Sequence, residues 1–472
     1  MVSTALIEKL QNIVGSDQVL TSEIDRFGYS YDSSFIPFSL ENTPHIVVRP
    51  RTTQEVSAIM TLAHAEEIPV TARGTASGRT GGSIPVCGGI SLALDRMNTI
   101  LELDEKNMMV TVEPGVRTME LYNFCATKGL FYPPDPASWK YSTLGGNIAE
   151  NAGGMRAVKY GVTNNYVMGL EVVLADGTII NTGGKAIKNV TGYNLTALFT
   201  GSEGTLGIVT KIILRLIPMP KQRNTLQLMF PSLNGACDTI HKMLQSGVVP
   251  AAAELMDKTS IQAVARHRHL DINQAIEACV ILEIDGETTE DLMKQAGQIQ
   301  KIAKEFNVRE VRVAKTPEEA DSIWSIRRGL SSAIGAMAPN RFGEDISVPR
   351  DAFPEAIRRI GKIAKKYDLT IAVYGHAGDG NVHPSVLCDI AKEDEAQRAH
   401  EAIDEIFAEA LALGGTLSGE HGIGLTKRPY IENALGQAGL AVLKNVKQAL
   451  DPKGILNPAK IWLPDDKEAA HK

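Results

Sequence analysis

The first hydrophobic pattern lies at the N-terminus, where apolar side chains recur at helical spacing. The segment MVSTALIEKLQNIV places Leu6, Ile7, Leu10 and Val14 on one face and polar residues on the other. This spacing predicts an amphipathic helix. The segment is also too polar for a secretory signal.

The pattern then changes to short apolar runs separated by turn signals. The runs HIVVRP (45–50) and IPVTARG (68–74) predict strands, and the intervening run TTQEVSAIMTLAHAEE predicts a helix. Its N-cap is expected at Thr52 or Thr53, which gives a β-α-β unit. The runs GGISLAL, MMVTVEPG, GLEVVLADGTII and GTLGIVTKIILRLIP predict further strands.

The organisation changes after Pro218, where MPKQRN reads as a linker. From Thr225 to about Thr416, strand-like runs alternate with polar helical segments, which favours an α+β module on a largely antiparallel sheet. The expected domains are residues 1–220, 221–416 and a C-terminal segment, 417–472.

Composition narrows the class of protein. A chain of 472 residues is too long for one ordinary core, and 43% hydrophobic with 22% charged residues is typical of a soluble globular protein. A net charge of −7 gives no reason to expect nucleic acid or an anionic membrane as partner. No apolar run is long enough to span a bilayer. The five scattered cysteines lack CxxC spacing, which argues against disulfides and a ligated iron–sulfur cluster and favours a cytoplasmic location.

The sequence contains three glycine-rich stretches, of which the first follows a predicted strand. The first, RGTASGRTGGSIP (73–85), permits close backbone approach and a nest of N–H groups for a diphosphate, although an ordinary irregular loop has the same composition. It matches neither the P-loop nor the GxGxxG fingerprint. Residues 133–163 and 200–210 add two similar stretches. Three such loops indicate a large, extended ligand held by backbone groups.

The stretch IAVYGHAGDGNVH (371–383) sets two histidines around a polar turn. On an unbroken strand His376 and His383 would face opposite ways, but the intervening GDGN sequence can reverse the chain so that both rings converge. With Glu420 of the GEHG sequence they form a ligand set that suits Zn²⁺, Fe²⁺ or Mn²⁺. The alternative is ordinary core or surface histidines. Asp379 is expected in the turn or orienting a histidine.

Eight motifs now occur in a characteristic order: RGTASGRTGG, VEPGV, PPDPAS, TLGGNIAENAGGMRAVKYGV, GSEGTLGIVT, YGHAGDGNVHP, SGEHGIG and DPKGILNPAK. Over roughly residues 20–463 the chain resembles FAD-linked D-2-hydroxyacid dehydrogenases of the vanillyl-alcohol-oxidase/p-cresol-methylhydroxylase superfamily. It is similar to the glycolate oxidase flavin subunit and FAD-dependent D-lactate dehydrogenases. The resemblance implies an α+β fold, with a two-subdomain FAD-binding domain and a cap domain on an antiparallel sheet.

The resemblance also implies the residues that hold FAD. The pyrophosphate is expected at the first loop, and the flavin and adenine at the later loops and the C-terminal tail. No histidine stands in the first loop where some relatives attach FAD covalently, so non-covalent FAD is expected. The expected FAD residues are Arg73, Gly74, Thr75, Ala76, Ser77, Gly78, Gly81, Gly82, Pro134, Thr143, Gly145, Gly146, Asn147, Gly153, Gly154, Gly161, Gly204, Ile208 and Asn457.

The implied chemistry is oxidation of a small 2-hydroxy acid chelated by the metal. His421 is expected to take the hydroxyl proton while hydride leaves C2 for flavin N5. Arg327, with Ser331 one helical turn away, is expected to bind the substrate carboxylate. An exposed salt bridge is the alternative for Arg327. Relatives that oxidise D-2-hydroxyglutarate carry a lysine where this chain has Gly343 or Glu344, which favours D-lactate or glycolate.

The resemblance implies a separate electron acceptor, such as an iron–sulfur subunit, an electron-transfer flavoprotein or a quinone-linked protein. Attachment to the inner membrane would then be peripheral, through that partner. Whether the chain forms a homodimer stays open, as does D-2-hydroxyglutarate dehydrogenase activity. Two rivals from other classes are a metal hydrolase or lyase and a flavin-carrying scaffold subunit. Neither rival explains why flavin loops and a metal cluster occur together.

Overall fold

The computed structural model describes residues 3–463. The chain forms two compact units. The first unit comprises Met1–Gly153, Val162–Met219 and Glu420–Lys472, and the second comprises Gly154–Gly161 and Pro220–Gly419. Each unit has its own sheets and core, so each is described by itself.

The first sheet of the first unit has four strands in the order β1-β2-β4-β3. Both β2 and β3 run parallel to β4, while β1 is antiparallel to β2. The β-α-β prediction is correct in its elements, but β4 lies between the two strands, which their sequence order does not reveal. The strand bounds are β1 Val19–Leu20, β2 Ile46–Val48, β3 Val70–Arg73 and β4 Ile90–Ala93.

Two helices cover this sheet and begin where the sequence predicts. Helix α1 (Thr4–Val14) buries Leu6 and Leu10, as its amphipathic pattern requires. Helix α3 (Thr53–Glu66) begins after Thr52, whose side chain accepts a hydrogen bond from the Glu55 N–H at 3.1 Å. The core between them contains Leu10, Val48, Val56, Ile59, Met60, Ile90 and Leu92.

The second sheet of this unit has five antiparallel strands in the order β5-β6-β10-β8-β9. Its strand bounds are β5 Ile100–Asp104, β6 Met109–Val112, β8 Val167–Val173, β9 Ile179–Gly183 and β10 Ile208–Arg215. A separate two-stranded sheet of the same unit pairs β7 Leu130–Phe131 with β11 Ile217–Pro218. The predicted strands are therefore confirmed. The unit's other helices are α2 Glu23–Phe27, α4 Thr118–Ala126, α5 Leu144–Glu150, α7 Leu195–Phe199 and α15 Ile431–Leu450.

Helix α5 lies in a stretch that the sequence led us to expect as loop. Its first turn contains Gly145 and Gly146, which have poor helix propensity. The Thr143 side chain caps it, accepting a hydrogen bond from the Gly146 N–H at 3.4 Å. The cap and the tertiary contacts of Leu144 and Ile148 thus override local propensity.

The second unit is built on an eight-stranded sheet in the order β15-β12-β14-β13-β18-β19-β16, with β17 also paired to β19. All its pairings are antiparallel, as predicted. The predicted linker 219–224 is wrong in its second half, because β12 begins at Gln222 and pairs there with Gly286 of β14. The bounds are β12 Gln222–Phe230, β13 Ala252–Asp257, β14 Ala278–Gly286, β15 Glu310–Val313, β16 Asn340–Gly343, β17 Ile346–Ser347, β18 Thr370–His376 and β19 Asn381–Cys388.

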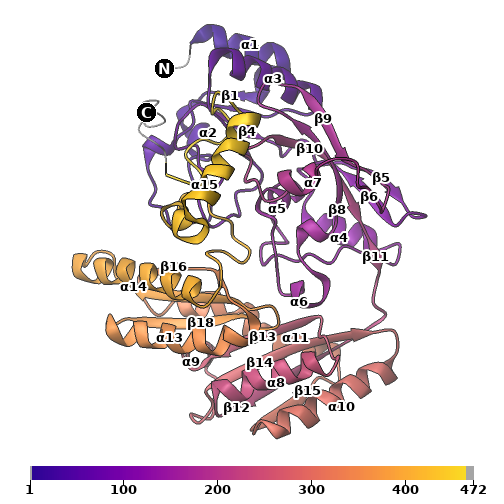
Figure 1. The fold of residues 1–472 in the computed structure, drawn as a ribbon, viewed down its shortest axis with the longest axis vertical. Helices are drawn as coiled ribbons and strands as arrows, with labels where there is room; N and C mark the ends of the chain where they lie inside the picture. The colour runs from indigo at the N-terminus through magenta and orange to yellow at the C-terminus, as the bar shows by residue number, and fades with distance from the viewer. Residues whose placement is uncertain (1–2, 464–472) are drawn as a thin grey trace. The chain divides into compact units, whose positions relative to one another are not determined.

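Helices cover both faces of this sheet. One group contains α8 Leu233–Gln245, α10 Thr289–Glu305, α13 Phe353–Lys366 and α14 Glu393–Ala412, of which α13 and α14 lie side by side (Figure 1). The other contains α9 Lys258–Arg268, α11 Pro317–Arg328 and α12 Leu330–Gly335, and the short α6 Ala157–Tyr160 packs on β13. The core beneath the second group contains Met256, Val264, Cys279, Ile281, Ile323, Trp324 and Ile334.

Short 3₁₀ turns complete the architecture, at Ser16–Gln18, Leu40–Asn42, Thr163–Asn165, Arg350–Ala352 and Arg428–Tyr430. The mixture of helices and sheets, antiparallel in the second unit, confirms the α+β class. Among the helices of residues 3–463, none is long and apolar enough to cross a membrane.

Candidate active site

The two predicted metal-ligating histidines meet on adjacent strands of the second unit. His376 ends β18 and His383 lies in β19, and the turn between the strands carries hydrogen bonds from the Asp379 and Gly380 N–H groups to the His376 carbonyl. The two Nε2 atoms are 3.4 Å apart. The GDGN turn therefore brings the rings together, as its composition predicts.

Strand register explains why both rings share one face. His383 pairs directly with Tyr374, which is two residues before His376 and therefore on the same face. On the neighbouring strand β13, Glu254 pairs with His376. Alternation along the three strands thus gathers one carboxylate, one tyrosine and two imidazoles on the face that α9, α11 and α12 cover.

Glu254 is a buried carboxylate that holds two groups at once. Its side chain is fully buried; one oxygen contacts His376 Nδ1 and the other accepts a hydrogen bond from Arg327 Nε at 2.6 Å. Burial raises the pKa of Glu254, but the charges and hydrogen bonds of His376 and Arg327 outweigh it and lower the pKa to about 2. Glu254 is therefore ionised, and an Nδ1–H donated to it leaves the His376 lone pair on Nε2.

Asp345 plays a similar part next to His383. Its carboxylate accepts hydrogen bonds from Asn381 Nδ2 at 2.6 Å, the Ser418 hydroxyl at 2.8 Å and the Gly419 N–H at 3.0 Å. Its Oδ1 is 3.8 Å from His383 Nδ1. Asp345 thus ties the histidine strand to the segment that leads directly into Glu420.

Asp379 has the turn role that was one of its two predicted roles, because its Oδ1 accepts a hydrogen bond from the Asn381 N–H at 3.3 Å. The carboxylates beside the histidines are instead Glu254 and Asp345, which sequence reasoning missed. A signal existed for Glu254, since it interrupts the apolar strand AAAELMD. Asp345 comes directly after Gly343 and Glu344, the positions where relatives that oxidise D-2-hydroxyglutarate carry a lysine. No local sequence pattern distinguishes it from other acidic residues.

Arg327 lies beside Glu254 and is mostly buried. Its side chain is 16% exposed, and its guanidinium carbon lies 4.8 Å from the centre of the Tyr374 ring. The alternative of an exposed salt bridge is therefore wrong. The expected single helix is also wrong: α11 ends at Arg328 and α12 begins at Leu330, and Ser331 accepts a hydrogen bond from Arg341 at 3.0 Å on an exposed surface.

The Glu420–His421 pair begins the C-terminal segment of the first unit and is anchored there. The Thr80 hydroxyl donates to the His421 carbonyl at 3.2 Å. The Glu203 carboxylate accepts hydrogen bonds from the N–H groups of Ile423 at 2.8 Å and Gly424 at 2.7 Å. The loop that carries His421 is thus held by residues of two glycine-rich stretches, the first and the third.

Those glycine-rich stretches surround a pocket in the first unit. Close packing at its wall requires glycine, because a Cβ on Gly145 would meet Pro114 at 2.6 Å. The same holds at Gly74, where a Cβ would collide with the Thr143 side chain. Seven of the predicted cofactor residues line this pocket: Arg73, Gly74, Thr143, Gly145, Gly146, Gly204 and Ile208.

The comparisons with known proteins match both halves of the chain. Residues 44–183 match the family model described as FAD binding domain, and residues 219–461 match FAD linked oxidases, C-terminal domain. The chain belongs to the FAD-linked oxidase family. It is therefore an oxidoreductase of that family, and the predicted resemblance is confirmed.

Named relatives agree over nearly the full length. The chain is 42% identical to the glycolate oxidase subunit GlcD of Bacillus subtilis, with 98% of each chain covered. It is 34% identical to the D-lactate dehydrogenase of Anaerostipes hadrus, again with 98% of each covered. A structure of p-cresol methylhydroxylase shares the fold at a TM-score of 0.80 and 18% identity, over 98% of both chains. The predicted fold type is thereby confirmed.

Buried polar groups at the first glycine-rich stretch fit FAD. Asn457 is 3% exposed, and its Nδ2 donates to the carbonyls of Gly82 and Glu203, both at 2.8 Å. Its Oδ1 has no partner within residues 3–463, and neither has the buried Ser83 hydroxyl. An unused acceptor and an unused hydroxyl are suited to a ligand that carries N–H groups, hydroxyls and phosphates.

The side chains of some predicted FAD residues hydrogen-bond within the protein. The Arg73 guanidinium donates to the carbonyls of Tyr29, Ser83 and Gly28 at 3.2–3.5 Å, so it fixes the N-terminal segment against the first loop. The Asn147 amide donates to Thr118 at 2.7 Å and ties α5 to α4. Gly154 and Gly161 bound the segment that belongs to the second unit. The remaining predicted residues, Thr75, Ala76, Ser77, Gly78, Gly81, Gly82, Pro134 and Gly153, lie in the first unit outside the lining of this pocket.

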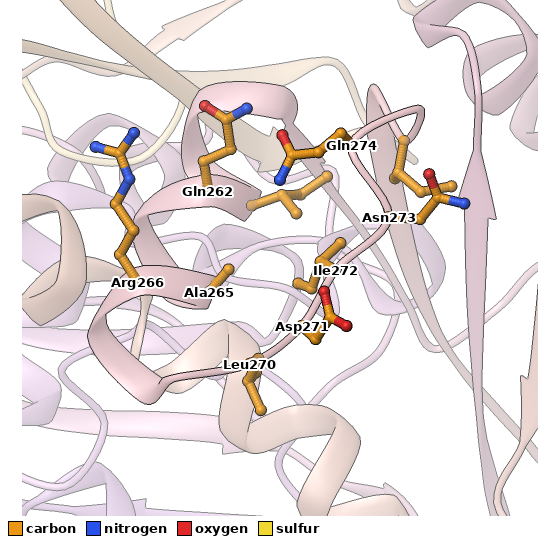
Figure 2. Close-up of a pocket in the computed structure, with 10 residues that line it drawn as sticks. Gln262, Ala265, Arg266, Leu270, Asp271, Ile272, Asn273 and Gln274 are labelled. Carbon is orange, nitrogen blue, oxygen red and sulfur yellow. The ribbon is translucent and has the colours of Figure 1, made fainter.

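A further pocket lies in the second unit, on α9 and the loop that follows it (Figure 2). Its wall includes Gln262, Arg266, Asp271, Asn273 and Gln274. None of these residues belongs to the histidine cluster or to the predicted substrate contacts.

Proposed function

We propose that this protein oxidises a small D-2-hydroxy acid, D-lactate or glycolate, to the corresponding 2-oxo acid with non-covalent FAD and a divalent metal ion. The names of its relatives, glycolate oxidase subunit and D-lactate dehydrogenase, support the substrate class. The observation that carries the metal part is the histidine pair, whose Nε2 atoms face each other beside an oriented arginine.

His376 and His383 are the proposed nitrogen ligands, and Glu420 is the third ligand. A metal ion bound there would polarise the substrate hydroxyl and lower its pKa. The two carboxylates beside the histidines keep the rings oriented, which fits the usual support of metal-bound histidine. Zn²⁺, Fe²⁺ and Mn²⁺ all suit two imidazoles and one carboxylate.

His421 is the proposed general base, and Arg327 binds the substrate carboxylate. The anchoring of the His421 loop by Thr80 and Glu203 supports the first role, because a base must be held close to the proton it removes. The bond from Arg327 Nε to Glu254 fixes the plane of the guanidinium, which supports the second. Bound FAD supplies the two-electron acceptor.

We further propose that the electrons pass to a protein or quinone-linked acceptor. The five cysteines are free thiols and are dispersed along the chain, so they do not provide a ligand set for an iron–sulfur cluster. The Bacillus subtilis relative is named as a subunit, which fits a partner that accepts electrons.

The experiment that tests the proposal is anaerobic bleaching of the visible flavin band. FAD-loaded protein, metal-replete or chelator-treated, is mixed with D-lactate, L-lactate, glycolate or D-2-hydroxyglutarate. We expect bleaching by D-lactate or glycolate, lost on chelation and restored by adding metal. Bleaching by the five-carbon diacid alone would replace the proposed substrate. No bleaching by any of the four acids would remove the 2-hydroxy-acid assignment.

A substitution of the proposed general base, His421, tests the proton-transfer step separately from cofactor binding. His421→Ala should slow bleaching by about 10²- to 10⁴-fold, the usual contribution of general base catalysis, with FAD and metal content unchanged. His400→Ala is the matched control, because His400 lies exposed on α14, where its ring hydrogen-bonds to the Ala396 carbonyl and contacts Phe342, neither of which is a proposed site residue. Equal rates in the two variants would rule His421 out as the base.

A further inference from the structure

The feature that carries a further inference is the position of Glu254 in the central sheet of the second unit. Strand β13 is apolar on both sides of it, and its neighbours in register are Ile281 of β14 and His376 of β18. A carboxylate in such a place is costly unless it is well bonded. The contacts of the Glu254 carboxylate therefore explain why a glutamate occupies this position.

Each oxygen of Glu254 has a separate partner, and the two partners have different proposed tasks. Oε1 contacts Nδ1 of the metal ligand His376, and Oε2 accepts the Arg327 Nε–H at 2.6 Å. The carboxylate is rigid and planar, so a rotation that follows one partner displaces the bond to the other. The interior around it is close-packed and leaves little room for independent adjustment.

We infer that Glu254 is a positioning residue that links the substrate-binding arginine to the metal site, so that metal affinity depends on the state of Arg327. This inference rests on the proposed function. Linkage of this kind is reciprocal: if Arg327 changes metal affinity through Glu254, then the metal changes the affinity of Arg327 for a carboxylate by the same factor.

Asp345 supplies a matched comparison within the same unit. It is as buried as Glu254 and lies next to the other histidine. Its hydrogen-bond donors, Asn381, Ser418 and Gly419, include no residue proposed to bind substrate. Asp345 should therefore support the metal site without transmitting anything from Arg327.

The test is a double-mutant cycle on metal affinity, measured with full-length, FAD-loaded protein and no substrate. The dissociation constant of Zn²⁺ is determined by competition with a chromogenic chelator for wild type, Glu254→Gln, Arg327→Met and the double variant. The amide of E254Q fills the same volume but offers only one oxygen, so it cannot accept from both partners.

We expect E254Q to weaken Zn²⁺ binding about 10- to 100-fold, as loss of a partner of a metal-bound histidine does. R327M should weaken it by a smaller factor of about 3- to 10-fold, within the usual range of coupling energies between contacting residues. The double variant should bind as E254Q does, because the link is already broken. In the Asp345→Asn background, R327M should keep its full separate effect.

Four outcomes would count against the inference. Zn²⁺ binding unchanged in E254Q would overturn it, as would an R327M effect of the same size with and without E254Q. Should E254Q fail to retain FAD or a cooperative unfolding transition, R327M alone decides: an unchanged dissociation constant overturns the inference. A wild-type protein that binds no Zn²⁺ stoichiometrically would instead remove the proposed metal site, and the inference with it.

Discussion

The two units handle buried charge in different ways. In the second unit, Glu254 has a cationic and an imidazole partner that lower its pKa to about 2 against the effect of burial. In the first unit, burial and the neighbouring Glu203 raise the pKa of Glu150 well above its ordinary value. The Glu150 Oε2 atom has no partner in the part of the chain that the structure describes.

Burial also affects a cation of the first unit, and the two units differ less in their buried amides than in their carboxylates. Burial lowers the pKa of Lys460 in the first unit to about 8. Within residues 3–463, Asn457 of the first unit and Asn381 of the second each leave Oδ1 without a hydrogen-bond partner, whereas each oxygen of the Asp345 carboxylate accepts a hydrogen bond. A buried polar group without a partner costs about 1–3 kcal/mol.

This difference indicates which unit has its buried carboxylates paired before a ligand binds. The histidine site is held in place by hydrogen bonds from its own unit, so it is preorganised. Among the described residues of the first unit, Glu150, Asn457 and Ser83 have buried polar atoms without a partner, which a cofactor can satisfy. The first unit should therefore depend on FAD for stability more than the second depends on any ligand.

The largest expected effect comes from removing FAD. A ligand that binds only the folded state at about 1,000 times its dissociation constant stabilises by about 4 kcal/mol. Without FAD we expect lower stability and faster amide hydrogen exchange at residues 73–85, 143–153 and 200–210. Strands β13, β18 and β19 should keep their protection. An equal loss of protection in both units would break the comparison.

Sequence reasoning found the elements that local chemistry determines. The Thr52 cap, the α1 stripe, the GDGN turn and the glycine loops each depend on residues close together in the chain. The predicted metal histidines also converge, because strand alternation and a turn suffice to place them.

What sequence reasoning missed depends on residues far apart. Glu254 lies 122 residues from His376, and Asp345 lies 73 from Ser418. Strand order determines such contacts, and β4 between β2 and β3 shows that strand order is not read from local pattern. Two predictions of secondary structure were wrong for a related reason. Tertiary contacts stabilise helix α5 although it contains two glycines, and they extend strand β12 into the predicted linker.

A smaller effect is expected at Asp257, the exception within the second unit. Burial raises its pKa to about 6 from 3.8, and its side chain caps α9 through the Ser260 N–H at 2.8 Å. Because the folded state then binds more protons than the unfolded state between these pH values, stability falls as pH rises from about 4 to 6. The lost stability amounts to at most about 3 kcal/mol, since one pKa unit corresponds to about 1.4 kcal/mol.

Asp257→Asn should remove that fall while keeping the cap, because asparagine caps helices as well as aspartate does. We expect the variant to unfold at a higher temperature than wild type at pH 8 and at a similar or lower temperature at pH 4. Thermal unfolding across this range measures the difference. A wild-type transition that does not weaken between pH 4 and 6 would contradict the raised pKa.

The smallest expected effects compare the two anchors on either side of Glu420 and His421. Ser418→Ala removes a charge-assisted hydrogen bond to Asp345 in the second unit, and Thr80→Val removes a neutral bond to the His421 carbonyl in the first. Such bonds contribute about 1.5–3 and 0.5–1.5 kcal/mol respectively. Asp345 keeps its bonds from Asn381 and Gly419, so S418A should lose a few-fold in metal affinity with little change in the rate of bleaching at saturating metal.

T80V should show the opposite result, because Thr80 bonds directly to the backbone of the proposed base, whereas Ser418 bonds to the carboxylate beside the proposed ligand His383. We expect a several-fold slower bleaching rate at saturating substrate, with a smaller loss of Zn²⁺ affinity than in S418A. Stopped-flow bleaching and chelator competition on the same two variants measure both quantities. If both variants changed mainly the same quantity, the anchors would not serve separate halves of the site, and the contrast between a preorganised metal unit and a cofactor-dependent flavin unit would lose its functional meaning.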